Sequence, residues 1–302
     1  MIIFIVITSF RADSENWTFR DNITYGIIDS TELQLNIAWP KITTKNSINK
    51  YPLIIFIHGG GWREGHRNAY NNQIKAAAER GYVGVTISHR LTSVVDKDGK
   101  TAYPWPASIH DSKAAVRFLK ANADKFHIDT CNIGITGSSS GGHLALMVGL
   151  TNNTPSLDGT VRVVGIDNNT SKSKISSKVH AVVNISGPTE MFSCHKAPKV
   201  TSYFEYLLGG SPLINPDAYL QSSPIQYVTK NTLPIMTIHG KNDDVVPFEQ
   251  ALILDAKIRA AGGVHNLYAL ENQGHIFNGN AEKESWTALY NFFDKHLKQG
   301  RD

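Results

Sequence analysis

Short apolar runs alternate with segments of helical pattern along most of the chain. Runs with the length and β-branched character of strands buried on both faces of a parallel sheet occupy 53–57, 82–88, 132–136, 179–185, 233–238 and 266–270. Helix-forming sequence or spacing predicts helices over 68–80, 107–122, 143–150, 248–261 and 281–297. Strands that alternate with helices imply right-handed βαβ units. The pattern therefore predicts the α/β fold class, with a mostly parallel sheet flanked by helices.

The remaining segments show other patterns. Residues 33–37 alternate apolar and polar side chains, as a half-buried strand does, so 23–39 predicts two strands joined by a turn. We expect a loop over 91–105, and a polar surface loop without strands over 152–177. Residues 188–230 hold Pro, Gly and aromatic residues without a clear period, which suits a small irregular cap. We therefore expect one domain over 17–302, with 188–230 as a cap-like insertion.

The first residues are almost wholly apolar. Met1–Phe10 reads MIIFIVITSF, which is too short to span a bilayer. It resembles the apolar part of a secretory signal, yet it lacks a charged start and a small-residue cleavage site. Residues 1–16 are thus interpreted as a signal segment, an extra strand or a disordered tail, and the protein as secreted in the first case and cytoplasmic otherwise.

Composition narrows the class of partner. The 302 residues are 41% hydrophobic and 19% charged, an ordinary globular balance, with a net charge of +4. The Lys and Arg residues are scattered, without a basic run interleaved with aromatics, so we expect no nucleic-acid partner. Cys131 and Cys194 can form one disulfide or none, and neither has metal-ligand spacing, so no metal or other cofactor is expected. Nothing in the sequence indicates an oligomeric state.

A candidate nucleophile lies between a predicted strand and a predicted helix. Residues 137–141 read Gly-Ser-Ser-Ser-Gly and fit G-x-S-x-G, the pattern of a nucleophile elbow. Glycines two positions before and two after select Ser139 among the three serines, since Ser138 would need a glycine in place of Thr136. The helix N-terminus that follows favours the negative charge that develops in acyl transfer. Ser139 is therefore the predicted nucleophile.

A nucleophilic serine needs a base and an acid that orients this base. In such folds the acid follows the serine along the chain, and the histidine base follows the acid. The strand over 233–238 is followed by two adjacent acids, Asp243 and Asp244, and the pattern alone leaves both open. His275 follows the next strand and is the predicted base.

A glycine-rich turn, His58-Gly59-Gly60-Gly61-Trp62, follows the strand over 53–57. Such a turn offers N–H groups to an oxyanion, and we expect these from Gly60 and Gly61, with Ser140 after the nucleophile.

With these residues in hand, the chain resembles α/β-hydrolase esterases that carry an HGGG turn, and is similar to the bifunctional feruloyl and acetyl-xylan esterase-like proteins. The resemblance runs from about Asn22 to the end. It rests on HGGGW at 58–62, Trp105-Pro106-Ala107 with Asp111, Gly137 to Gly142, Ser186-Gly187-Pro188-Thr189, HG-x-x-D-x-x-VP at 239–247, and Gly274-His275. It implies a triad of Ser139, Asp243 and His275, because HG-x-x-D selects Asp243. Two departures are Ser140, where many relatives have alanine, and His89, where the family has tyrosine.

The resemblance implies a serine carboxylic-ester hydrolase that acts on acetyl or feruloyl esters of plant polysaccharide. A small-molecule esterase or arylformamidase is the alternative enzyme, and a catalytically silent binding protein is the alternative of another class. Trp62 is predicted either to bind substrate or to belong to the core. The resemblance also implies a buried ion pair between Arg90 and Asp111.

Overall fold

A nine-stranded sheet organises the chain. The computed structural model describes residues 16–42, 50–94, 101–152, 154–166 and 175–298. The strand order is β11-β10-β9-β7-β3-β4-β2-β1-β8. The members of this sheet are β1 (Trp17–Ile28), β2 (Thr31–Pro40), β3 (Tyr51–Ile57), β4 (Val83–Ile87), β7 (Ile128–Ser138), β8 (Arg162–Val163), β9 (Ala181–Ile185), β10 (Ile235–Gly240) and β11 (His265–Leu270). The strands from β11 to β4 pair in parallel, while β2, β1 and β8 add antiparallel pairs at one side.

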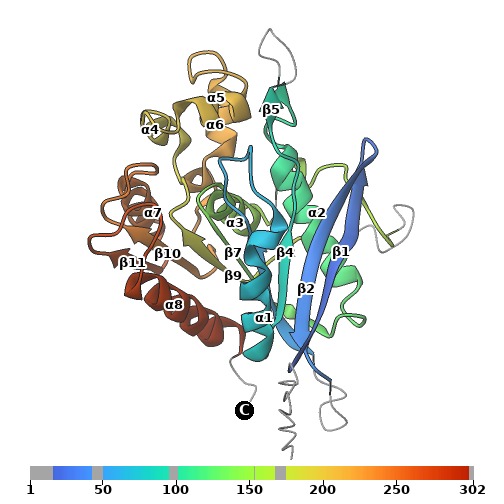
Figure 1. Cartoon of the computed structure of the whole chain (residues 1–302). Coiled ribbons are helices and arrows are strands. Elements are labelled where there is room, and N and C mark those ends of the chain that lie inside the picture. Colours follow the sequence, from blue (N-terminus) through green and yellow to red (C-terminus); the bar gives the residue numbers. More distant parts are fainter. Residues whose placement is uncertain (1–15, 43–49, 95–100, 153, 167–174, 299–302) are drawn as a thin grey trace, which may run out of the picture.

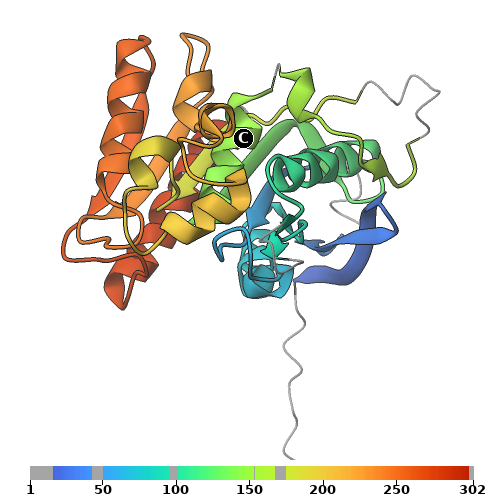
Figure 2. The ribbon, with the colours of Figure 1, turned by 90° about the horizontal axis from the view of Figure 1, so that it is seen from above.

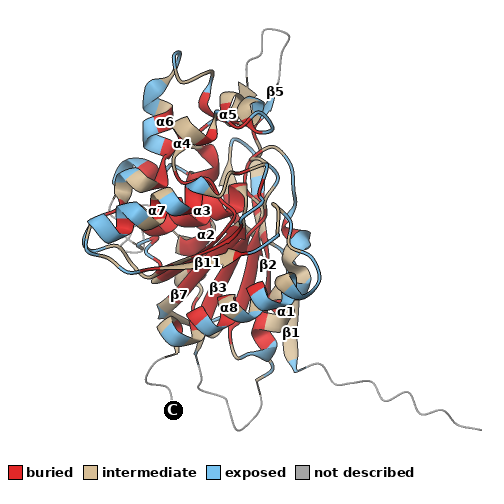
Figure 3. Ribbon diagram, turned by 90° about the vertical axis from the view of Figure 1, so that its left-hand side faces the viewer, coloured by how far each residue is buried: buried red, intermediate tan, exposed pale blue. Residues whose placement is uncertain are grey.

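Helices cover both faces of this sheet (Figure 1). One face packs against α2 (Ala107–Ala121), α3 (Ser140–Leu150) and α7 (Glu249–Ala260), and the other against α1 (Asn71–Glu79) and α8 (Asn280–Leu297). Strand β3 shows why both faces are apolar, because Leu53, Ile55 and Ile57 enter the first core and Ile54 and Phe56 the second. Figure 3 shows the buried strands between helices that expose their outer sides. The predicted mostly parallel sheet flanked by helices is confirmed.

Short helices form a cap on one end of the molecule. They are α4 (Met191–Cys194), α5 (Thr201–Leu208), α6 (Pro216–Ser222) and the 3-10 turn η4 (Pro224–Tyr227). In the view from above, these segments lie over the side of the molecule that holds β9 to β11 (Figure 2). The segment 188–230, which has no clear period in sequence, is thus mostly short helices.

The structure corrects other local expectations. The segment 152–177, predicted to lack strands, contains η2 (Pro155–Leu157) and β8, whose two residues pair with β1. The predicted loop over 91–105 contains a two-stranded ladder of β5 (Ser93–Val94) and β6 (Thr101–Ala102). Strand β1 begins at Trp17, ahead of the predicted start at 23. The two-residue strands β5, β6 and β8 are too short to show a periodicity in the sequence. The remaining short turn, η1 (Arg67–Tyr70), precedes α1.

The two ends of the chain complete the description. Residues 1–15, which carry the predicted signal segment apart from Asn16, lie outside the described residues. Among the helices that the structure describes, none combines the length and the apolar character needed to cross a membrane. Both cysteines are free thiols, with Cys131 exposed and Cys194 buried.

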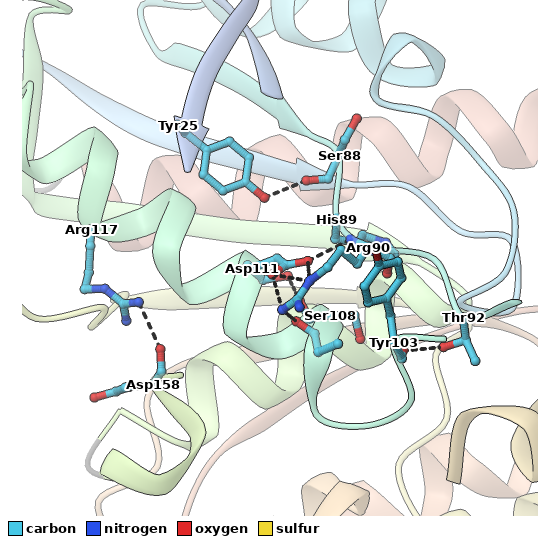
Figure 4. A network of polar contacts seen from close by, with 12 residues as sticks. Tyr25, Ser88, His89, Arg90, Thr92, Tyr103, Ser108, Asp111, Arg117 and Asp158 are labelled. Atoms are coloured by element: carbon cyan, nitrogen blue, oxygen red, sulfur yellow. Dashed lines mark hydrogen bonds and ion pairs between the residues drawn. The ribbon is translucent and has the colours of Figure 1, made fainter. Parts of the chain in front are cut away.

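A buried ion pair joins the segment after β4 to helix α2 (Figure 4). The Arg90 guanidinium donates to both Asp111 oxygens, with Nη2 at 2.8 Å from Oδ1 and Nε at 3.0 Å from each oxygen. The Arg90 backbone N–H donates to Oδ2 at 2.7 Å, and Nη2 also donates to the Ala107 carbonyl at 3.2 Å. Their side chains are 7% and 0% exposed. The ion pair implied by the family resemblance is therefore present and shielded from water.

Replacement of Arg90 by Ala should lower the free energy of unfolding by about 3–5 kcal/mol, because the Asp111 carboxylate would stay buried without its cation. Urea denaturation followed by circular dichroism measures this change. Arg259→Ala, which removes an exposed partner of Asp255, is the control and should change the midpoint little. Equal midpoints for the two variants would contradict the expectation.

Candidate active site

Ser139 occupies a strained turn between β7 and α3. Its φ of 55° and ψ of −124° lie in a region that L-residues rarely adopt. A Cβ on Gly137 would lie 2.5 Å from the Gly141 backbone, and a Cβ on Gly141 would lie 2.1 Å from the Ile57 carbonyl oxygen. Both positions therefore need glycine, which gives the G-x-S-x-G spacing a steric cause. The Ser139 N–H donates to the Ile185 carbonyl at 2.8 Å and ties the turn to β9.

Asp243 and His275 meet at the same edge of the sheet, in loops that follow β10 and β11. The Nδ1–H of His275 donates to Oδ2 of Asp243 at 2.7 Å. The Asp243 side chain is fully buried, whereas that of His275 is 16% exposed. Burial raises the pKa of Asp243, but hydrogen bonds from His239 and His275, the charge of His275 and the Val245 N–H together outweigh burial and hold this pKa below its usual range. The carboxyl is thus an anion at neutral pH.

The neighbouring acid has another environment. The Asp244 side chain is 70% exposed and pairs with Lys199 of the cap at 2.5 Å. The structure therefore brings Asp243, and not Asp244, to His275.

The glycine turn after β3 borders Ser139 and carries unused backbone donors. Gly60 and Gly61 adopt φ values of 120° and 59°, so the turn relies on glycine. Gly60, Gly61 and Ser140 line the same pocket as Ser139 and His275. Within the described residues, no hydrogen bond engages the N–H groups of Gly60, Gly61 or Ser140. These groups can therefore bind an oxygen that enters the pocket.

Two stacked histidines support the glycine turn from behind. The rings of His58 and His89 lie 4.5 Å apart at 17°. Burial lowers the pKa of His58 to about 3 and that of His89 to about 4, so both are neutral near pH 7. His89, which replaces the family's tyrosine, thus serves as a flat neutral support.

Trp62 joins the glycine turn to α3 and the cap. Its Nε1–H donates to His143 Nδ1 at 3.2 Å, and His143 Nε2–H donates to the Ser222 carbonyl at 2.7 Å. This pattern requires neutral His143, and burial lowers its pKa to about 4. Trp62 lines the pocket but is only 2% exposed and packs edge-on against Phe204. Its ring forms part of the wall, while its N–H is already bonded within the protein.

The pocket at this edge has a volume of about 550 Å³. The cap contributes residues that the sequence did not single out. Tyr203 on α5 lies over Gly61, where a Cβ would come 2.3 Å from its ring. Arg63 lies 5.6 Å from the Tyr203 ring centre and 4.3 Å from that of Tyr206. The other side chains that surround the opening are mostly apolar: Pro188, Val200, Phe204, Val245, Val246 and Ile276, with Glu64 and Lys199 as the charged members.

Residues 35–258 match the model of one protein family, BD-FAE. The chain belongs to the BD-FAE family. The match covers Ser139, Asp243 and the glycine turn and ends before His275. The family match and the similar solved structures confirm the α/β-hydrolase fold of this BD-FAE chain. One of these structures is an esterase of Thermogutta terrifontis, with 21% identity and a TM-score of 0.71.

Several relatives of this BD-FAE chain are esterases by name. Esterase LipC of Mycobacterium tuberculosis is 32% identical over 232 residues, which are 75% of this chain and 53% of LipC. A bifunctional GH43-CE protein of Bacteroides eggerthii shares 30% identity at a TM-score of 0.71, over 91% of this chain and 38% of that chain. A truncated carbohydrate esterase from gut microbiota shares 29% identity at a TM-score of 0.73, over 93% and 98%. The BD-FAE chain spans about half the length of the curated relatives that it matches.

In the described part of this BD-FAE chain, no group of three or more His, Cys, Asp or Glu side chains is arranged to hold a metal ion. The chemistry available at the pocket is that of Ser139, His275, Asp243 and the free N–H groups.

The strain at Ser139 gives a prediction that needs no substrate. The Ser139→Gly variant should have a free energy of unfolding about 1 kcal/mol higher than that of the Ser139→Ala variant. Glycine adopts the observed φ without strain, whereas alanine retains the strain. Thermal unfolding of the two variants measures the difference. An alanine variant as stable as the glycine variant would show that the turn stores no such strain.

Proposed function

We propose that this protein is a serine carboxylic-ester hydrolase with Ser139 as nucleophile, His275 as base and Asp243 as the acid that orients the base. The observation that carries the proposal is the 2.7 Å hydrogen bond from His275 Nδ1 to a fully buried Asp243, because His275 lines the same pocket as the strained Ser139. The unused N–H groups of Gly60, Gly61 and Ser140 support it, because an acyl-transfer site needs donors for its oxyanion.

The proposed reaction follows from the tautomer of His275. Because Nδ1 carries the proton donated to Asp243, Nε2 is left to take the Ser139 hydroxyl proton as the serine oxygen attacks the ester carbonyl. The oxyanion lies against the free N–H groups, and Asp243 stabilises the imidazolium. His275 then gives its proton to the departing alcohol oxygen, leaving an acyl-serine. Water, deprotonated by His275, attacks this ester and releases the acid, and Ser139 regains a proton.

For the substrate we propose acetyl or feruloyl esters of plant polysaccharide. The volume of about 550 Å³ and the mostly apolar lining suit an aromatic acyl group beside Tyr203, Phe204 and Val200. The charged Glu64 and Lys199 supply polar contacts of the kind that a sugar needs. The names of the two carbohydrate-esterase structures favour the same class.

The triad assignment predicts a sharp contrast between neighbouring acids. Asp243→Asn should lower kcat on p-nitrophenyl acetate by about 10⁴-fold, in line with the effect of the same change in other triads, while the exposed Asp244→Asn should leave it within roughly twofold. Ser139→Ala should reduce hydrolysis to background with an unchanged circular dichroism spectrum. Retained turnover in Ser139→Ala, or a larger loss in Asp244→Asn, would refute the assignment.

The substrate class is tested by release of acid from polymer. Mass spectrometry of feruloylated and acetylated xylan after treatment should detect free ferulate and acetate. Tyr203→Ala should raise KM for methyl ferulate by roughly tenfold and for p-nitrophenyl acetate much less, because only the larger acyl group reaches the α5 ring. Turnover of small aryl esters without release from xylan would favour a small-molecule esterase.

A further inference from the structure

A second histidine bonds the carboxylate of the proposed triad. We propose that His239 is a positioning residue, which fixes the Asp243 oxygen that also accepts the hydrogen bond from His275. This inference rests on the proposed function, since it assigns the environment of the proposed acid.

The position of its protons follows from the partners of His239. Nε2 lies 3.1 Å from Oδ2 of Asp243 and 2.9 Å from the carbonyl oxygen of Val246. Both partners are acceptors, so Nε2 carries the ring proton, which is donated to Val246 and also lies within reach of Oδ2. Nδ1 is buried and has no hydrogen-bond partner in the described structure. The ring can therefore serve Asp243 through Nε2 alone.

His239 completes the set of donors around the carboxylate. Oδ1 accepts the N–H groups of Val245 and Val246, each at 2.9 Å. Oδ2 accepts from His275 at 2.7 Å and lies 3.1 Å from Nε2 of His239, whose single proton it shares with the Val246 carbonyl. A carboxylate has about four acceptor sites, and here three N–H groups and the shared proton of His239 surround them. The plane of Asp243 is therefore fixed on both sides, and so is the direction of its bond to His275.

The surroundings make His239 rigid. Its side chain is 0% exposed, near the end of β10, and its ring meets Phe248 edge-on at 5.7 Å. Another titratable group, the Cys194 thiol on α4, is buried near Asp243. Burial, and then the charge of Asp243, raise the pKa of this thiol. Asp244 pairs with Lys199 at the surface. The N–H of His239 is therefore held in place beside the carboxylate oxygen that His275 also contacts.

Loss of the His239 donor should affect the reaction rather than substrate binding. His239→Phe keeps a ring beside Phe248 but removes the N–H. We expect kcat to fall roughly tenfold, the loss associated with one hydrogen bond to a charged group, with KM unchanged. The acidic limb of kcat/KM should move up by roughly 0.5 pH unit, because the charge then concentrates on His275 and stabilises its protonated form. His239→Gln, which can still donate, should restore most of kcat and the original limb.

A matched control exists at the opposite edge of the sheet. His265 is also buried and bonded to an acid, with Nδ1 at 3.0 Å from Asp255 and Nε2 at 2.9 Å from the Thr237 hydroxyl. His265→Phe should lose stability but keep kcat and the pH profile. Should His239→Phe fail to fold, His239→Asn, which is too short to reach Asp243, replaces it in the comparison.

The outcomes separate this inference from the proposed function. An unshifted limb and a kcat equal to wild type in His239→Phe, with Ser139→Ala and Asp243→Asn inactive, would overturn the role of His239 alone. A loss of kcat that His239→Gln does not rescue, or that His265→Phe reproduces, would also overturn it. Activity retained in Ser139→Ala or Asp243→Asn would instead overturn the triad.

Discussion

The structure depends on one very close contact between backbones. The start of α3 lies so near the end of β3 that a methyl group on Gly141 would come 2.1 Å from the Ile57 carbonyl oxygen. This contact places the strained Ser139 beside the glycine turn that follows β3. Because the two strands are parallel neighbours, both segments emerge at the same edge, and the cap then covers them. Larger residues at Gly137 or Gly141 would separate the serine from the glycine turn.

Uncharged histidines surround this edge and give it a particular electrostatic character. His58 and His89 stack behind the glycine turn, and His143 connects Trp62 to the cap. Burial lowers the pKa of all three, so they act as hydrogen-bonding or packing groups without adding positive charge. The Asp243 anion therefore acts chiefly on His275, which is the partly exposed histidine of the pocket.

Sequence predicts best what short-range rules dictate. The turn at Ser139 is recognisable because steric limits on Gly137 and Gly141 leave a local signature, and the long strands and helices follow from periodicity. The choice between Asp243 and Asp244 needed family resemblance, because adjacent acids look equivalent until burial separates them. The place of Tyr203 over Gly61 comes from tertiary packing, as do the two-residue strands β5, β6 and β8. No local pattern encodes these contacts.

The strand order also divides the chain into two contiguous halves. Strands β1 to β4, β7 and β8 form one block of the sheet, and β9 to β11 form the other. Ser139 and the glycine turn belong to the first block, whereas Asp243 and His275 belong to the second. Within the sheet the blocks join through one ladder, from Gly134 with Ala181 to Ser138 with Ile185. Two separately produced fragments cut between β8 and β9 would each hold half of the chemistry, so the architecture is suited to a split-enzyme reporter whose signal appears when this seam forms.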